Sequence, residues 1–265
     1  MDLTASRAKE LDASLHNATR AELKDLAILF GESVDVIRGV ETPYEELVKS
    51  PFAVDQHEGR PFGTLRLGFQ SHRAEYPITD DAHARVLKQL AELGVQEPDA
   101  GPSWLVTSTL DNKLVFANLA QLVDVECIGD DTEQMPSFQH PEVYSSLEGM
   151  EPDEEPDLSE GFGPLLASKV RDLIGQEAFD DAVHQVSHVR LVSGCGQEQW
   201  HFVLDGDATL GFYTLELESY GPMAPNRFLL ITSEDTEHER FVNLSHLSLI
   251  EMPMNRYLRV NIDPN

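Results

Sequence analysis

Residues 104–126 read WLVTSTLDNKLVFANLAQLVDVE, and residues 229–251 read LLITSEDTEHERFVNLSHLSLIE. Aligned at a constant offset of 125 positions, the two stretches share eight identical residues in 23 positions without a gap. The identical pairs are Leu105/Leu230, Thr107/Thr232, Ser108/Ser233, Phe116/Phe241, Asn118/Asn243, Leu119/Leu244, Leu122/Leu247 and Glu126/Glu251. We therefore interpret the chain as a tandem duplication, and predict that both stretches form the same strand–turn–strand unit.

Helices are predicted before the first repeated segment, and strands around it. Thr19 and Glu22 stand at capping-box spacing, and apolar residues follow at helical spacing up to Phe30. Residues 63–78 alternate apolar and polar side chains across a short turn, which predicts a strand pair. Residues 79–93 are typical of an amphipathic helix, and Asp111-Asn112 predicts a hairpin turn between strands.

The second half repeats this order. Residues 162–175 and 177–187 predict two helices, and two strand-like runs follow up to residue 204. Arg66 corresponds to Arg190 at an offset of 124. Residues 210–220 fit a strand as well as a helix, and both interpretations stay open. The predicted fold class is α+β, a duplicated unit with N-terminal helices and a small, mostly antiparallel five-stranded sheet or barrel.

The domain boundaries follow from the segment that separates the two halves. Residues 129–161 contain eleven carboxylates, no Lys or Arg, and prolines at 136, 141, 152 and 156. A segment of this composition buries too little apolar surface to offset the cost of ordering it. The sequence therefore predicts a first unit at 1–128, a solvated acidic linker at 129–161 and a second unit at 162–265.

Each half resembles an Sm-like or SH3-like small β-barrel, in which a helix precedes five short strands. The runs VFANLAQLVDVE and FVNLSHLSLIE are similar to the late strands of such barrels, where a polar turn precedes the closing strand. The resemblance implies a small barrel in each half, and no binding residues carry over. RNA binding, which Sm-like proteins show, is opposed here by the acidic balance, because no basic strip with interleaved aromatic residues is visible.

Charge excludes several classes of partner. The chain has 47 Asp and Glu against 19 Lys and Arg, a net charge of −28, which repels nucleic-acid backbones and anionic membrane surfaces. No basic-then-apolar leader opens the sequence, and no apolar run approaches the roughly 18–20 residues of a membrane span. The two cysteines, Cys127 and Cys195, are too few for a disulfide framework. We expect a cytoplasmic protein with a basic protein partner.

The conserved-looking polar residues of the repeat have a structural interpretation and a functional one. An Asn before a turn, such as Asn118 or Asn243, accepts a hydrogen bond from the backbone two residues ahead, so we expect a structural role. Glu126 and Glu251 end the closing strands and are expected to face solvent. The alternative is that the four residues line a groove between the two units.

The search for catalytic chemistry yields three histidines. His184 and His188 stand four residues apart at a predicted helix, and His201 follows on a predicted strand. Two rings on one helix face are a typical start of a metal site, but the HExxH glutamate is missing between them. Cys195 lies in a Gly-Cys-Gly turn that predicts a tight loop rather than a nucleophile. We predict no catalytic, cofactor-binding or metal residues.

Three functional hypotheses follow. The first is a non-enzymatic interaction or regulatory protein that binds a basic protein surface. The second is a hydrolase or metal-dependent enzyme using His184, His188 and His201, and the third is an Sm-like RNA binder. The sequence leaves the biological process, the partner and the oligomeric state open.

Overall fold

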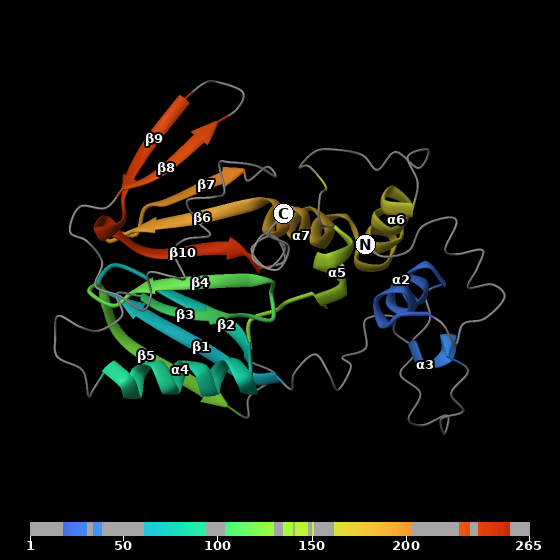
Figure 1. The fold of residues 1–265 in the computed structure, drawn as a ribbon, viewed down its shortest axis with the longest axis horizontal. Coiled ribbons are helices and arrows are strands. Elements are labelled where there is room, and N and C mark those ends of the chain that lie inside the picture. Colours follow the sequence, from blue (N-terminus) through green and yellow to red (C-terminus); the bar gives the residue numbers. More distant parts are fainter. Residues whose placement is uncertain are drawn as a thin grey trace. The chain divides into compact units, whose positions relative to one another are not determined.

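The computed structural model describes residues 18–30, 34–38, 61–93, 104–129, 135–139, 141–147, 150, 162–202, 228–233 and 238–254. These residues belong to two compact units (Figure 1). The helical unit combines Met1–Glu58 with Gln139–Val186, and the sheet unit combines Gly59–Phe138 with Ser187–Asn265. Each unit thus takes segments from both halves of the chain, which departs from the predicted boundaries at 128 and 162. Residues 4–16 and 42–50, where the sequence also predicts helices, lie outside the described residues, as does the segment 210–220.

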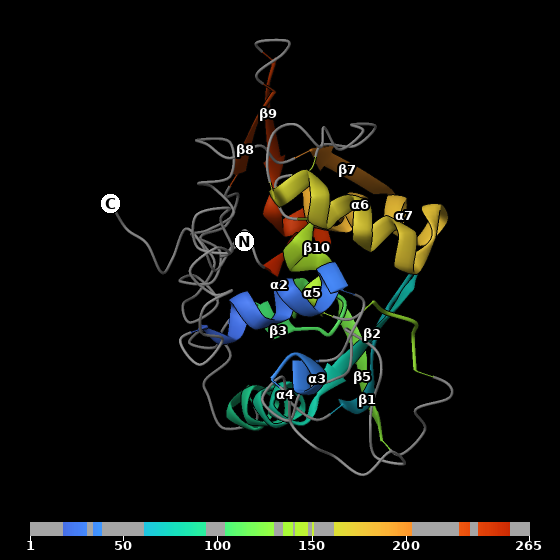
Figure 2. The same cartoon turned by 90° about the vertical axis from the view of Figure 1, so that its right-hand side faces the viewer.

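The helical unit is built from short amphipathic helices. They are α2 (Arg20–Phe30), α3 (Val34–Ile37), α5 (Pro141–Ser146), α6 (Phe162–Ile174) and α7 (Gln176–Ser187), all labelled in Figure 2. The predicted capping box of α2 is confirmed, because the Thr19 backbone N–H donates to Glu22 Oε2 at 2.7 Å and the Glu22 N–H donates to Thr19 Oγ1. The buried side chains of this unit form one core, made of Ile28, Val143, Tyr144, Leu147, Leu166, Ala167, Val170, Phe179, Ala182, Val183 and Val186.

Part of the segment predicted as a solvated linker is folded. Residues 141–146 form α5, and Val143, Tyr144 and Leu147 are buried in the core of the helical unit. The high carboxylate content of residues 129–161 concealed this short apolar run, because three large side chains within five positions are enough to bury one face of a helical turn. The solvated-linker prediction therefore fails for residues 143–147.

The sheet unit contains three antiparallel sheets. β1 (Pro61–Phe69), β2 (Arg73–Thr79) and β5 (Leu122–Gly129) form a sheet of order β2-β1-β5. β3 (Trp104–Ser108), β4 (Lys113–Asn118), β6 (His188–Ser193), β7 (Glu198–Phe202) and β10 (Leu247–Pro253) form a sheet of order β3-β4-β10-β6-β7. β8 (Phe228–Ser233) and β9 (His238–Asn243) form a separate hairpin, and the 3-10 turn Leu244–His246 leads into β10.

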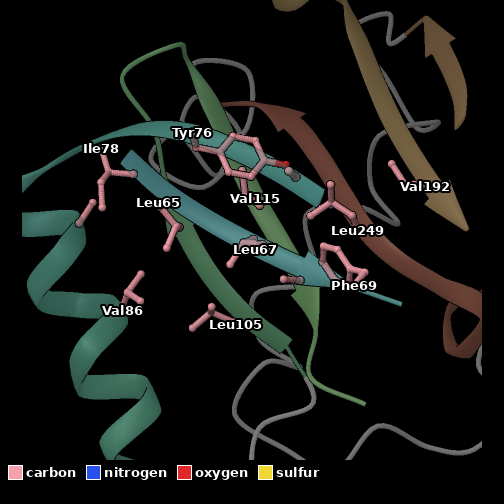
Figure 3. Close-up of a cluster of buried hydrophobic side chains, with 13 residues drawn as sticks. Leu65, Leu67, Phe69, Tyr76, Ile78, Val86, Leu105, Val115, Val192 and Leu249 are labelled. Atoms are coloured by element: carbon pink, nitrogen blue, oxygen red, sulfur yellow. The ribbon is translucent and has the colours of Figure 1, made fainter. Parts of the chain in front are cut away.

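The five-stranded sheet lies between two cores, as the alternation along β4 shows. Val115 and Ala117 face the inner core, which lies against the β2-β1-β5 sheet, whereas Leu114 and Phe116 face the outer core, which lies against the β8–β9 hairpin. The inner core consists of Leu65, Leu67, Phe69, Ala74, Tyr76, Ile78, Ala82, Val86, Leu105, Val115, Ala117, Val192 and Leu249 (Figure 3). The outer core consists of Trp104, Leu114, Phe116, Val189, Leu191, Leu229, Ile231, Leu244, Leu247, Ile250 and Met252.

One helix covers the inner core. α4 (Asp80–Leu93) contributes Ala82 and Val86, and the close-up shows Val86 pointing toward Leu65 and Ile78 (Figure 3). The helix starts as predicted, because Thr79 Oγ1 accepts a hydrogen bond from the Ala82 N–H at 3.2 Å. Among the described residues, no helix combines the length and the apolar character needed to cross a membrane.

The described strands form open antiparallel sheets rather than closed barrels, which corrects the barrel alternative. The reason lies in the partner of β4. A barrel of five successive strands keeps its hydrogen bonds within one half of the chain, but β4 of the first half pairs with β10 of the second half over residues 113–117 and 249–253. The predicted hairpin turn is present, with Asn112 in a left-handed conformation at φ 60° between β3 and β4.

Candidate functional site

A buried group of charged side chains lies on the inner face of the five-stranded sheet. Its centre is Glu251 of β10, which is only 3 % exposed. Tyr76 Oη, from β2, donates a hydrogen bond to Glu251 Oε1 at 2.6 Å, and Arg190 Nη1, from β6, donates to the same oxygen at 2.6 Å. The Tyr76 bond connects the β2-β1-β5 sheet to the five-stranded sheet, whereas the Arg190 bond joins neighbouring strands within the five-stranded sheet. We call Tyr76, Asp111, Lys113, Arg190, Glu198 and Glu251 the Glu251 cluster.

Lys113 supplies the second positive charge of the cluster. Its Nζ lies 2.7 Å from Asp111 Oδ2 and 3.8 Å from Glu251 Oε2, and it sits over the ring of Tyr76. Burial lowers the pKa of Lys113, but the charges of Asp111 and Glu251 outweigh this effect and raise it. Burial and the Glu251 charge raise the pKa of Tyr76 well above its ordinary value. Tyr76 is therefore a neutral hydrogen-bond donor to Glu251.

Arg190 extends the cluster toward the surface. Its guanidinium binds Glu198 of β7 through Nε and Nη2 and lies over the ring of Trp200, with its Cζ atom 5.5 Å from the ring centroid. The hydrogen bond from Arg190 lowers the pKa of Glu198. Burial lowers the pKa of Arg190, but Glu198 and Glu251 raise it overall. The cluster therefore alternates positive and negative groups from the interior to the sheet edge.

The first half of the chain has a similar arrangement on the outside of the β2-β1-β5 sheet. Arg66 donates to Glu75 Oε1 at 2.6 Å and to Glu126 Oε2 at 2.8 Å, and these bonds raise the pKa of Arg66. Arg66 stands directly opposite Glu126 in the β1–β5 pairing, as Arg190 stands opposite Glu251 in the β6–β10 pairing. The two glutamates differ in exposure, since the Glu126 side chain is 46 % exposed.

Glu126 and Glu251 do not come together. Val125 and Cys127 of β5 pack against the inner core, so alternation turns Glu126 to the opposite face of its sheet, away from Glu251. The prediction that Glu251 faces solvent is wrong. It fails because Tyr76 and Lys113, which cover the carboxylate, come from strands that the linear sequence does not place beside β10.

The two asparagines of the repeat make the same local turn. The Oδ1 atom of Asn118 accepts the Ala120 N–H at 3.0 Å, and the Oδ1 atom of Asn243 accepts the Ser245 N–H at 3.0 Å. This confirms the predicted hydrogen bond to the backbone two residues ahead. Asn118 goes further, because it is buried and its Nδ2 donates to the Leu247 carbonyl at 2.8 Å. It thereby ties the end of β4 to the start of β10.

The two positions should respond differently to substitution. We expect Asn118→Ala to lower the free energy of unfolding by about 1–3 kcal/mol, because it removes a buried hydrogen bond between distant strands as well as the turn bond. Asn243→Ala, which removes only a local turn bond at a more exposed site, should cost about 0.5–1 kcal/mol. Urea unfolding of the two variants measures both values. Equal losses would contradict a tertiary role for Asn118.

The predicted histidines lie in different elements and do not converge. α7 ends at Ser187, so His184 lies on the helix, whereas His188 is the first residue of β6, and the prediction of one shared helix is wrong. His188 stands opposite Phe202 and His201 stands opposite Val189, so the two rings leave the β6–β7 hairpin on opposite faces. Burial lowers the pKa of His201 and of His184. The described residues contain no group of three His, Cys, Asp or Glu side chains that suits a metal ion.

The two cysteines differ in exposure and in the direction of their pKa shifts. Cys195 is exposed at the β6–β7 turn, where a hydrogen bond with Ser193 Oγ lowers its thiol pKa. Burial raises the pKa of the Cys127 thiol on β5. Both are free thiols, and Gly196 next to Cys195 adopts the left-handed φ of 83° that the predicted tight turn requires.

The Glu251 cluster is buried at its centre and exposed at one end. Glu251 and Tyr76 are almost fully buried, and Glu198 is the cluster's exposed end. Such a cluster fixes the relative position of two sheets, at the cost of desolvating its charges. Of its six members, sequence reasoning selected only Glu251 as a site residue. The sequence signal for Arg190 was its correspondence with Arg66. An arginine and a glutamate that both recur in the two halves indicate an ion pair between neighbouring strands.

Comparisons with protein-family models, with curated proteins and with solved structures give no match for this chain.

Proposed function

We propose that the protein is a non-enzymatic interaction protein, built from two related α+β halves, that binds a basic protein partner through its acidic segments. The observation that carries this proposal is where the negative charge lies. The described residues include 12 Lys and Arg against 18 Asp and Glu, which is −6 of the net charge of −28, so −22 belongs to the remaining residues. Most of the acidic excess therefore lies outside the described residues.

Several charges of the described fold are paired within it. Arg66, Arg190 and Lys113 each contact two carboxylates, drawn from Glu75, Glu126, Glu198, Glu251 and Asp111. By contrast, residues 151–160 contain six carboxylates and no Lys or Arg. A segment of this kind attracts basic surfaces over a Debye length and favours fast, salt-dependent association.

The duplication is part of this proposal, and the strand registers support it. Arg66↔Glu126 and Arg190↔Glu251 occupy the same position in the β1–β5 and β6–β10 pairings. β3–β4 and β8–β9 are both hairpins formed by the repeated segments. They differ by one residue in register, because Leu105 stands opposite Ala117 whereas Leu230 stands opposite Phe241. Duplication of one ancestral half would account for these correspondences.

A defined basic peptide tests the proposed partner chemistry. The full chain is titrated against a fluorescently labelled 20-residue peptide, (Lys-Arg-Ser-Gly)5, and against the same peptide with Gln in place of Lys and Arg. We expect binding of the basic peptide alone, with a dissociation constant that rises steeply between about 50 and 200 mM salt. Fluorescence anisotropy gives the values.

A pair of variants with equal charge separates a binding segment from general attraction. The first variant is Glu151→Gln, Asp153→Asn, Glu154→Gln and Glu155→Gln. The control is Glu92→Gln, Asp172→Asn, Glu177→Gln and Asp181→Asn, on exposed sites of α4, α6 and α7. We expect the first variant to weaken peptide binding about tenfold or more and the control less than threefold. Equal losses would refute a binding role for residues 151–155.

The alternative hypotheses have separate readouts in the same experiment. An oligouridine RNA at the same salt concentration replaces the peptide, and its binding would favour an Sm-like RNA binder instead. An enzyme using His184, His188 and His201 would lose its activity in single alanine variants at each histidine, whereas an interaction protein would keep its peptide affinity in all three.

A further inference from the structure

β5 and β9 are edge strands, and each has one edge without a partner among the described strands. β5 is the last strand of the β2-β1-β5 sheet, and β9 pairs only with β8. Their counterparts in the other half of the repeat are fully paired. β10, the counterpart of β5, lies between β6 and β4, and β4, the counterpart of β9, lies between β3 and β10. An unpaired edge exposes a row of backbone N–H and C=O groups that can accept another strand.

The β4–β10 pairing predicts how β9 and β5 would pair. In it, Phe116 stands opposite Ile250 and Val115 stands opposite Glu251. Moving each residue to its counterpart at the offset of 125 places Phe241 opposite Val125, and Arg240 opposite Glu126. The first pair is apolar and the second joins opposite charges, although neither was used to find the register.

The exposure of Phe241 indicates that this pairing is missing. Phe116 is 0 % exposed in the outer core, where it packs beside Ile250 of the neighbouring strand. Its counterpart Phe241 is 60 % exposed. Phe228 and Leu230 are also exposed on this face of the hairpin, and Leu230 stands directly opposite Phe241. The hairpin thus has apolar side chains on both faces, since Leu229 and Ile231 already fill the outer core.

The acceptor side of the pairing is incompletely covered. Val125 and Cys127 of β5 pack against the inner core but are only partly buried, at the open edge of their sheet. In the transferred register Phe241 lies beside Val125 on this face. It would extend the inner core as Phe116 extends the outer core. Arg240 would reach Glu126, whose Oε2 atom already accepts a hydrogen bond from Arg66.

We propose that β9 of one molecule adds to the β5 edge of a second copy of this chain, forming a five-stranded sheet of order β8-β9-β5-β1-β2 across the interface. The same chain cannot supply both strands without unfolding. Its β8–β9 hairpin is held in the outer core by Leu229 and Ile231, whereas its β5 lies beyond the inner core on the opposite face of the five-stranded sheet. When each copy adds its β9 to the β5 edge of the other, the result is a closed dimer with two equivalent strand pairings.

Association of the full chain and cysteine cross-linking test this interface. Sedimentation velocity over a concentration series should show reversible dimerisation of the unmodified chain. Phe241→Asp should raise the dimer dissociation constant by about 30-fold or more, because it places a charge against Val125. Leu173→Asp, a change at an exposed apolar residue of α6, is the control and should leave dimerisation unchanged.

Cross-linking tests the register of the β9–β5 pairing and whether the two strands come from different molecules. In a chain carrying Cys127→Ala and Cys195→Ala, the added pair Arg240→Cys and Glu126→Cys should oxidise to a covalent dimer, since directly opposed residues bring their Cβ atoms within about 5 Å. The control pair is Arg240→Cys and Glu75→Cys. It should not cross-link, because Glu75 lies on β2, two strands beyond β5. A disulfide within one molecule would overturn the second-copy assignment, and a monomer at all concentrations without cross-linking would overturn the proposal. Neither result bears on peptide binding by residues 151–155.

Discussion

Replacing Glu251 with alanine is expected to lower the free energy of unfolding by about 3–5 kcal/mol. The substitution leaves Arg190 and Lys113 without their shared carboxylate in a buried environment, and it removes the acceptor of the Tyr76 hydroxyl. Arg190 keeps Glu198 and Lys113 keeps Asp111, but the largely buried cations cannot replace the lost carboxylate with full hydration, so the penalty exceeds the strength of the lost ion pairs. Guanidinium unfolding followed by circular dichroism measures the change.

The matching position in the first half provides an internal control. Glu126→Ala removes the same type of residue from the same register opposite an arginine, but at a solvated site where Glu75 still pairs with Arg66. We expect a loss below about 1 kcal/mol. Similar losses for Glu126→Ala and Glu251→Ala would mean that burial does not distinguish the two ion pairs.

Tyr76→Phe separates the hydroxyl from the ring within the same cluster. The phenyl ring keeps its packing in the inner core, while Glu251 retains Arg190 and Lys113. The expected loss is therefore only about 1.5–3 kcal/mol, that of one hydrogen bond to a carboxylate.

The sequence predicts local structure well where a short-range signal is available. The capping box at Thr19, the helix that begins after Thr79 and the hairpin turn at Asn112 depend on residues within a few positions of one another. The turns at Asn118 and Asn243 belong to the same class, because an Asx side chain needs only its own backbone. The α+β class with antiparallel sheets follows from these elements.

Long-range pairing is what local patterns do not encode. β4 has the same alternation whether it pairs with β5 of its own half or with β10 of the other half, so the barrel and the mixed five-stranded sheet are equally consistent with it. The environment of Glu251 depends on that choice. Its neighbour on β4 is Val115, and the hydroxyl that reaches it comes from β2, 175 positions away in sequence.

Phe116→Ala is expected to cost about 3–5 kcal/mol, because it leaves a cavity where strands from both halves of the chain meet. Phe116 is fully buried among side chains of the outer core, and β4 is held between β3 and β10, so little relaxation is available to fill the space. The same experiment distinguishes β4 from its counterpart β9. Phe241→Ala should cost below about 1 kcal/mol at protein concentrations where the chain is monomeric, since its ring is largely solvated.

The stability difference between Phe241→Ala and the unmodified chain should depend on protein concentration. If Phe241 is buried by a second copy, the stability of the unmodified chain increases with protein concentration by mass action, and that of Phe241→Ala does not. At low concentration, the loss in the free energy of unfolding caused by Phe116→Ala contains no contribution from dimerisation, because Phe116 is buried within one molecule. Unfolding curves of the three chains at two concentrations therefore separate packing within one molecule from β9–β5 pairing between two molecules. A Phe241→Ala deficit that stays constant between the two concentrations would show that β9 is not completed by another copy.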